Sequence, residues 1–114
     1  MFAKQFNPWE VWYAEFPFED IEGKCSGRPV IVLSATNHTV LVVKVTCHSR
    51  RSADKFDIPL RFWDYAHLNY PSVARVSKTI ELTPDKLMKK IGTLCSSDAF
   101  SVFNAYRQLL LAER

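Results

Sequence analysis

Two runs of β-branched and aliphatic residues near the middle of the chain constrain the fold more than any other feature. They are residues 28–34, RPVIVLS, and residues 39–48, TVLVVKVTCH, joined by the short segment ATNH. Valine and isoleucine favour extended backbone, and threonine and asparagine in the connection are typical of a turn. The pattern therefore predicts an antiparallel hairpin in a β-sheet.

Other segments add further elements around this hairpin. Bulky and β-branched residues favour extended backbone, and prolines confine a strand to an edge or begin a helical turn. We expect strands at residues 10–16, 56–60 and 72–82, a loop at 17–27, a turn at 61–71 and a short helical turn beginning at Pro84.

The C-terminal residues have a different period. Their apolar side chains recur at spacings of three and four, which indicates a helix with one apolar face. The residues of this stripe are Ala99, Val102, Phe103, Tyr106, Leu109 and Leu110. Ser96 or Ser97 is suited to cap the helix, and we expect the stripe to pack on the sheet.

The length and composition fit one folded domain covering residues 1–114, with 47% hydrophobic residues. This content is sufficient for a buried core. About five strands with short connections and one terminal helix predict a mainly β fold, either a strongly bent antiparallel sheet or a small, partly open barrel. The spacing of a parallel α/β fold and internal repeats are both absent from the sequence.

The charge and the cysteines limit the classes of partner and compartment. The net charge of +3 permits a polyanionic partner without requiring one. The three cysteines form no CxxC pair and follow no secretory segment, so we expect free thiols and a cytoplasmic protein. The longest apolar run, Val40 to Val43, is far shorter than the ~20 residues that cross a bilayer, so no membrane role is expected.

The second long run ends in KVTCHSRR, which collects a thiol, an imidazole, hydroxyls and cations. Strand alternation predicts one apolar face and one mixed face. The apolar face holds Leu41, Val43, Val45 and Cys47, and the mixed face holds Val40, Val42, Lys44, Thr46 and His48. We therefore expect Cys47 in the core, where its thiol stays protonated.

A metal site is not expected at this strand end. Cys47 and His48 point to opposite sides of the strand, and zinc needs about four ligands at chelating spacings. His38 and His67 lie in expected loops without nearby ligands. The mixed face and the residues beyond it suit an anionic ligand instead. Arg28 begins the neighbouring strand, so antiparallel pairing places it near Thr46 or His48, although a solvated strand-end charge is an alternative interpretation.

The ordered motifs resemble a known family. EVWYAEFPF, a glycine-containing loop, GRPVIVLS, VLVVKVTCHSR, PSVARVSK and KKIGTL, followed by a helix, together resemble the MazF/PemK toxins of type II toxin–antitoxin systems from Glu10 to Leu110. The resemblance implies an SH3-like barrel with a terminal helix, a homodimer and a cognate antitoxin. It also implies metal-independent, sequence-specific cleavage of single-stranded RNA through 2′-hydroxyl attack, giving a 2′,3′-cyclic phosphate and a 5′-hydroxyl without a cofactor.

Catalytic roles follow from the same resemblance. Arg28 corresponds to the family's arginine in the RP step, and Thr46 to its threonine at the end of the next long strand. Arg28 would stabilise charge on the scissile phosphate, and Thr46 would donate a hydrogen bond to a phosphate oxygen. His48 is a candidate general base because imidazole titrates near neutral pH, while a simple strand-end histidine is an equal alternative.

Further side chains are candidates for RNA contact. They are Lys44, Ser49, Arg50, Ser72, Arg75, Trp63 and Glu22. Trp63 stands in an expected loop, where it is better suited to stack on a base than tryptophans in strands, which favour core packing. Glu22 precedes Arg28 by six residues, whereas relatives often carry an acidic residue closer to the arginine.

Two other classes of function remain open at this point. The altered glycine loop permits a non-catalytic SH3-like module that binds RNA or a protein tail. A thiol- or metal-dependent enzyme would rest on Cys47 and His48 alone.

Overall fold

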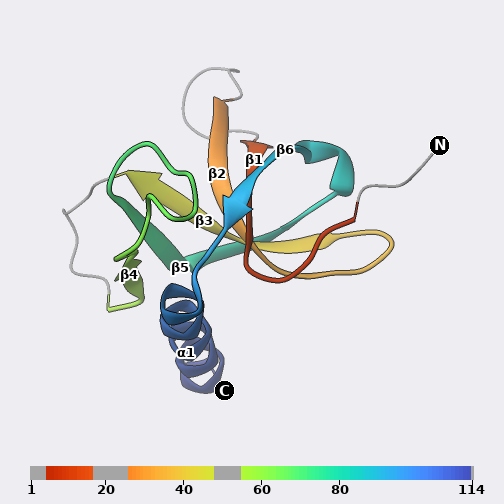
Figure 1. The fold of residues 1–114 in the computed structure, drawn as a ribbon. Coiled ribbons are helices and arrows are strands. Elements are labelled where there is room, and N and C mark those ends of the chain that lie inside the picture. The colour runs from red at the N-terminus through yellow and green to blue at the C-terminus, as the bar shows by residue number, and fades with distance from the viewer. Residues whose placement is uncertain (1–4, 17–25, 48–54, 114) are drawn as a thin grey trace.

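The computed structural model describes residues 5–16, 26–47 and 55–113 (Figure 1). Its elements are β1 (Glu10–Phe16), β2 (Ser26–Ala35), β3 (Val40–Cys47), β4 (Asp57–Pro59), β5 (Ser72–Leu82), a 3-10 turn (Pro84–Lys86), β6 (Leu87–Thr93) and α1 (Ser96–Ala112). The strands form an antiparallel sheet in the order β4-β5-β3-β2-β1-β6. The sheet ends at β4 and β6 and is not closed, so the expectation of a bent antiparallel sheet with a terminal helix is confirmed in its open form.

The central hairpin is also confirmed. β2 and β3 pair with Ile31 opposite Val43, and their connection is fixed by a threonine. The Thr36 amide donates to the Thr39 carbonyl oxygen at 2.8 Å. The Thr36 hydroxyl oxygen accepts from the amides of His38 at 3.1 Å and Thr39 at 3.0 Å. A threonine side chain therefore replaces backbone partners in this turn.

A large irregularity in β5 bends the sheet. Lys44 and Val43 are consecutive in β3, yet their partners in β5 are Arg75 and Thr79. Residues 76–78 therefore bulge from the ladder, and the Thr79 hydroxyl donates to the Val76 carbonyl oxygen at 2.6 Å across the bulge. Such a bulge increases twist and re-aims the strand.

The bend creates two buried clusters. The helix-side core lies between the sheet and α1, and includes Val11, Ile31, Val43, Val45, Ala74, Val76, Ala99 and Val102. The inner core lies on the other face, and consists of Trp12, Ala14, Val30, Val32, Val40, Val42, Leu82 and Leu87. Val40 and Val42 are therefore fully buried, which corrects the expectation of one mixed face along the whole of β3. Only the end of that face is polar, because the bent sheet encloses its beginning.

The helix α1 uses a narrower stripe than the sequence predicts. Ala99, Val102 and Ala105 are buried, whereas Phe103 and Leu110 are each 46% exposed. Tyr106 and Leu109 are partly buried and pack against the helix-side core as expected, so Phe103 and Leu110 are the members of the predicted stripe that are exposed. The N-cap is Cys95 and its side chain makes no capping bond, so the expected cap at Ser96 or Ser97 is wrong. Within the described ranges, no helix has the length and apolar character needed to span a membrane.

The strand β6 is absent from the sequence-based expectation. It pairs with β1 through two register shifts, which break the period of two that reveals a strand. Its sequence LMKKIGT also carries lysines at a sheet edge. Lysines and bulges protect an edge strand from pairing with other chains, and the same features conceal the strand in the sequence.

A buried carboxylate, Glu10, ties β1 to the segment before it and to β6. It is 5% exposed. Its Oε1 accepts from Trp12 Nε1 at 2.9 Å and from the Asn7 amide at 3.1 Å. Its Oε2 accepts from Asn7 Nδ2 at 3.1 Å and lies 3.2 Å from Lys90 Nζ. Burial raises the pKa of Glu10, but the hydrogen bonds from Trp12, Asn7 and Lys90 outweigh it and hold the pKa below its ordinary value of 4.5.

We expect acid to destabilise the protein through Glu10. Because the pKa is lower folded than unfolded, the stabilisation is complete above the unfolded value of 4.5 and is lost as the pH falls through the folded value. Urea unfolding measured from about pH 6 to about pH 3 should therefore show a steeper loss in wild type than in Glu10→Gln. Equal slopes in the two proteins would contradict this role.

Candidate active site

Four polar side chains continue the face of the inner core to its rim. In β2, Arg28 stands two residues before Val30 and therefore lies on the same face of the sheet. In β3, Lys44 and Thr46 stand two and four residues after Val42 and lie on that face as well. Arg75 lies opposite Lys44 in β5. We call Arg28, Lys44, Thr46 and Arg75 the rim. Arg28 is exposed, and the other three are half-buried, so this edge of a buried cluster presents three cations and a hydroxyl.

The register directs Arg28 toward Thr46. The described β2–β3 ladder ends with Val30 opposite Lys44, and two more residues of the same register set Arg28 opposite Thr46. Each residue is held from its other side, Arg28 by Ala14 of β1 and Thr46 by Val73 of β5. Paired strands lie about 4.8 Å apart, so the long Arg28 side chain and the Thr46 hydroxyl are able to contact one ligand.

A carboxylate that the sequence did not single out orients the rim. Asp57 of β4 lies directly opposite Arg75, and Arg75 Nε donates to its Oδ1 at 3.2 Å. Their side chains are 31% and 20% exposed, respectively. The bond uses one donor of a guanidinium that carries five N–H groups. The set of Arg28, Lys44, Arg75 and Asp57 remains net positive and suits an anionic ligand. The expectation of an edge strand at 56–60 is the only sequence signal that points to Asp57.

An aromatic ring explains the glycine before Arg28. Tyr13 of β1 packs on Gly27, where an added Cβ would lie 2.6 Å from Tyr13 Cε2. The ring therefore lies flush against the backbone that carries Arg28. Tyr13 itself is 42% exposed, whereas its neighbour Trp12 is buried in the inner core.

Ser72 and Trp63 belong to the side of the helix-side core and not to the rim face. Ser72 is 7% exposed and shares a strand face with Ala74 and Val76 of the helix-side core. Its hydroxyl donates to the Tyr70 carbonyl oxygen at 2.7 Å. Trp63 is half-buried and packs against the same core. Their contact with RNA stays a prediction, and any such role for Ser72 acts from behind the rim face.

Several expected site residues fall outside the described residues. They are Glu22, His48, Ser49 and Arg50, together with the side chain of Cys47. Within the described part of the chain, no group of three or more His, Cys, Asp or Glu side chains is arranged to hold a metal ion. The described rim offers positive charge and a hydroxyl donor to an anion.

An open, bent antiparallel sheet with a terminal helix and a cationic rim defines a class of small SH3-like β proteins. The family follows from the sequence match. The model of the PemK-like, MazF-like toxins of type II toxin–antitoxin systems matches residues 7–110, and the chain belongs to this family.

Solved structures with the same fold support the architecture. A MazE–MazF structure from Deinococcus radiodurans has a TM-score of 0.73 at 15% identity, covering 91% of this chain and 94% of that chain. The Mycobacterium tuberculosis toxin MazF-mt6 has a TM-score of 0.68 at 22% identity, covering 91% and 96%. A mycobacterial endoribonuclease in complex with its cognate antitoxin has a TM-score of 0.69 at 14% identity, covering 90% and 92%. Comparison with curated protein sequences gives no match.

Proposed function

We propose that the chain is an endoribonuclease that cleaves single-stranded RNA at specific sequences without a metal ion. The observation that carries this proposal is the register that directs Arg28 toward Thr46 on a cationic rim. Membership of the PemK-like, MazF-like toxin family supports it. A protein of the same fold described as an endoribonuclease adds support, although its identity is only 14%.

The proposed reaction is an internal phosphoryl transfer. The 2′-oxygen forms a bond to the adjacent phosphorus, the bond from phosphorus to the 5′-oxygen breaks, and a 2′,3′-cyclic phosphate and a 5′-hydroxyl result. A base removes the 2′ proton, and the leaving oxygen gains one. We assign the base to His48, which lies outside the described residues.

Arg28 and Thr46 act on the charge that develops during this reaction. The planar guanidinium of Arg28 binds two phosphate oxygens at once, and the Thr46 hydroxyl donates to another. An arginine is poorly suited to supply the proton of the leaving oxygen because it stays protonated at any ordinary pH. We therefore assign Arg28 an electrostatic role.

We further propose a cytoplasmic homodimer that a cognate antitoxin neutralises. MazE–MazF structures of the same fold from Deinococcus radiodurans support a protein partner. Exposed apolar side chains on α1 also support one, since Phe103 is 46%, Leu110 46% and Leu111 60% exposed. Apolar surface of this kind is typical of protein contacts.

The function is tested with purified protein and an unstructured RNA in EDTA. We expect cleavage, with 2′,3′-cyclic phosphate and 5′-hydroxyl ends detected by mass spectrometry. A matched RNA with a single 2′-deoxy substitution at the cleaved nucleotide should resist cleavage there, because the attacking group is missing. Products with 5′-phosphate ends, or cleavage that requires added Mg²⁺, would contradict the mechanism. Tight binding without any product would favour the non-catalytic binding module.

A further inference from the structure

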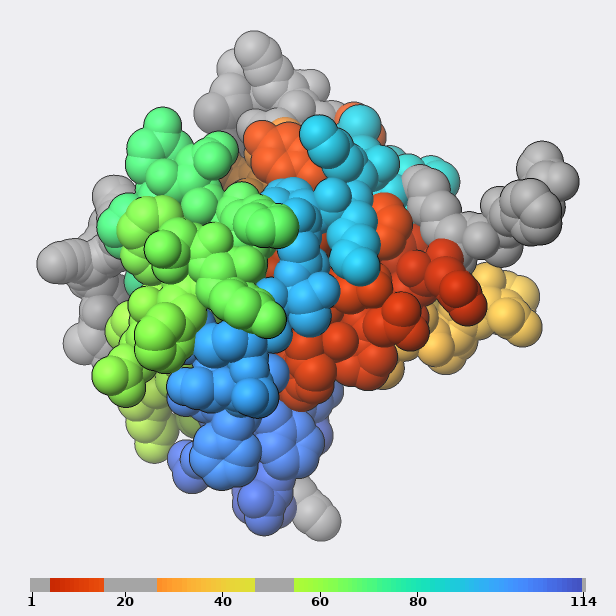
Figure 2. Space-filling view, in the orientation of Figure 1, coloured from red at the N-terminus to blue at the C-terminus, as the bar shows by residue number. Residues whose placement is uncertain are grey.

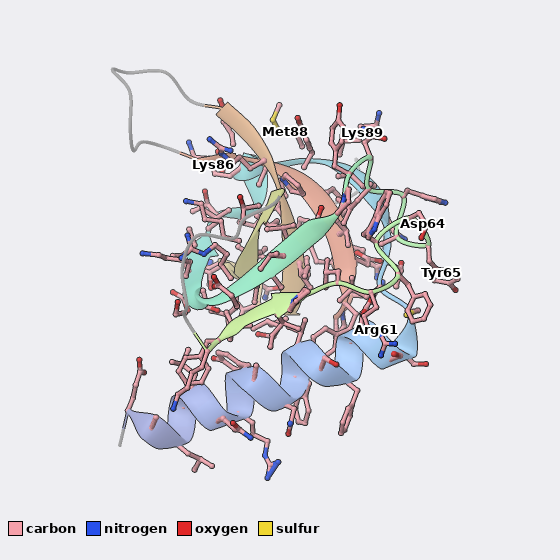
Figure 3. All side chains as sticks on the ribbon, turned by 90° about the vertical axis from the view of Figure 1, so that its left-hand side faces the viewer. Arg61, Asp64, Tyr65, Lys86, Met88 and Lys89 are labelled. Atoms are coloured by element: carbon pink, nitrogen blue, oxygen red, sulfur yellow. The ribbon has the colours of Figure 1, made fainter. Side chains whose placement is uncertain are left out.

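The segment between β4 and β5, residues 60–71, is anchored to α1 at its beginning. Both oxygens of the Asp98 carboxylate accept backbone hydrogen bonds, from Arg61 at 3.0 Å and from Phe62 at 2.9 Å. Asp98 is 1% exposed. Figure 3 shows Arg61 beside the N-terminal end of the helix. A buried carboxylate therefore fixes where this segment leaves β4.

The middle of the same segment is anchored to β6. His67 Nδ1 lies 3.1 Å from the Ile91 carbonyl oxygen. Any side chain at Gly92 would clash with the carbonyl oxygen of Ala66, so the two backbones lie in close contact. Figure 2 shows the segment, in green, packed against the blue surface of β6. Glycine at position 92 permits this approach.

The end of the segment is held just before β5. The Ser72 hydroxyl donates to the Tyr70 carbonyl oxygen at 2.7 Å. Pro71 follows Tyr70 and restricts its backbone to extended conformations. Yet the Tyr70 side chain is 66% exposed. A large aromatic ring is thus exposed on a backbone that a proline and a side-chain hydrogen bond restrict.

A short stretch of chain links Tyr70 to the strand that carries Arg75 of the rim. Val73 of β5 pairs with Thr46, and Tyr70 precedes Val73 by three residues. Three residues of extended chain span at most about 10 Å, so the backbone of Tyr70 lies within about that distance of Val73. Tyrosine faces stack on unpaired bases, and a preorganised ring binds at low entropic cost.

We propose that Tyr70 stacks on an unpaired base beside the scissile phosphate, and that Ser72 is a positioning residue that acts through Tyr70. This inference rests on the proposed RNA cleavage. The rim binds the phosphate, and Tyr70 orients the neighbouring nucleotide. Ser72, which lies behind the rim face, then contributes to RNA binding without touching RNA.

The test compares RNA binding by Tyr70→Ala with binding by a matched variant, Tyr65→Ala. Tyr65 belongs to the same segment and is 64% exposed, but it stands nearer the end anchored to α1. The probe is a fluorescent RNA with a 2′-deoxy substitution at the cleaved nucleotide, so that it binds without reacting. We expect Tyr70→Ala to raise Kd by about tenfold or more, and Tyr65→Ala to leave Kd near the wild-type value.

Conservative variants separate stacking from other roles. Tyr70→Phe and Tyr70→Trp should retain binding, whereas Tyr70→Leu, apolar but not aromatic, should lose it. Ser72→Ala should raise Kd in wild type but add nothing in Tyr70→Ala, because it acts through the ring. In cleavage assays on unsubstituted RNA, Tyr70→Ala should raise KM more than it lowers kcat.

The outcomes distinguish this inference from the proposed function. If wild type cleaves RNA and Tyr70→Ala binds and cleaves equally well, the stacking role is wrong and the nuclease stands. If Tyr70→Phe binds RNA as weakly as Tyr70→Ala, the hydroxyl group and not the ring makes the contact, and the stacking role is wrong. If wild type neither binds nor cleaves RNA, the proposed function fails and this inference fails with it.

Discussion

Replacing Arg28 with alanine is expected to lower the rate of RNA cleavage by about 10²- to 10³-fold, the usual effect of removing one preorganised donor from a developing anion. Arg28 is exposed at the rim, so its loss removes no buried contact and should leave the unfolding midpoint unchanged. The measurement is single-turnover cleavage of a saturating enzyme–RNA complex, which reports chemistry rather than binding.

Two further variants make this result specific. Arg28→Lys keeps the charge but loses the planar fork, so it should recover only part of the rate. Arg107→Ala removes an exposed arginine from α1 and the same net charge, and it should cleave at the wild-type rate. If Arg28→Ala cleaves as fast as Arg107→Ala, the rim is not the catalytic site.

The sequence was most informative where local pattern and burial agree. The hairpin of β2 and β3 combines β-branched runs with a threonine turn, and alternation alone grouped Lys44 with Thr46. The alternation did not show that Val40 and Val42 are buried on that same face, because their burial depends on the bend in β5. The local pattern shows on which face of the sheet a residue lies, whereas its burial depends on how the sheet bends around that face.

Contacts between distant segments were beyond the reach of sequence reasoning. Asp57 lies in an expected edge strand, but only the register across β4 and β5 reveals that it pairs with Arg75. Asp98 reads as an ordinary acidic residue in the first turn of a helix, where it favours the helix dipole. Its real partners are the backbone amides of Arg61 and Phe62, far away in the sequence.

The expected change with the largest effect on stability is Asp98→Ala. The carboxylate is 1% exposed and accepts two backbone hydrogen bonds, so its loss leaves two amides without their partner. Charge-assisted bonds of this kind make the expected loss about 2–4 kcal/mol in the free energy of unfolding. Urea unfolding measures this loss of stability. The control is Asp64→Ala, because Asp64 is an exposed carboxylate in residues 60–71, the segment that Asp98 anchors.

Asp98→Asn keeps one carbonyl acceptor and loses the charge, so its stability should fall between those of wild type and Asp98→Ala. Because Asp98 lies on α1 and does not belong to the rim, the folded fraction of either variant should still cleave RNA in conditions well below its unfolding midpoint. Equal stability of Asp98→Ala and Asp64→Ala would show that water replaces the carboxylate at this anchor. Arg28→Ala and Asp98→Ala therefore probe separate properties, since the first removes chemistry from a folded protein and the second removes stability from an intact rim.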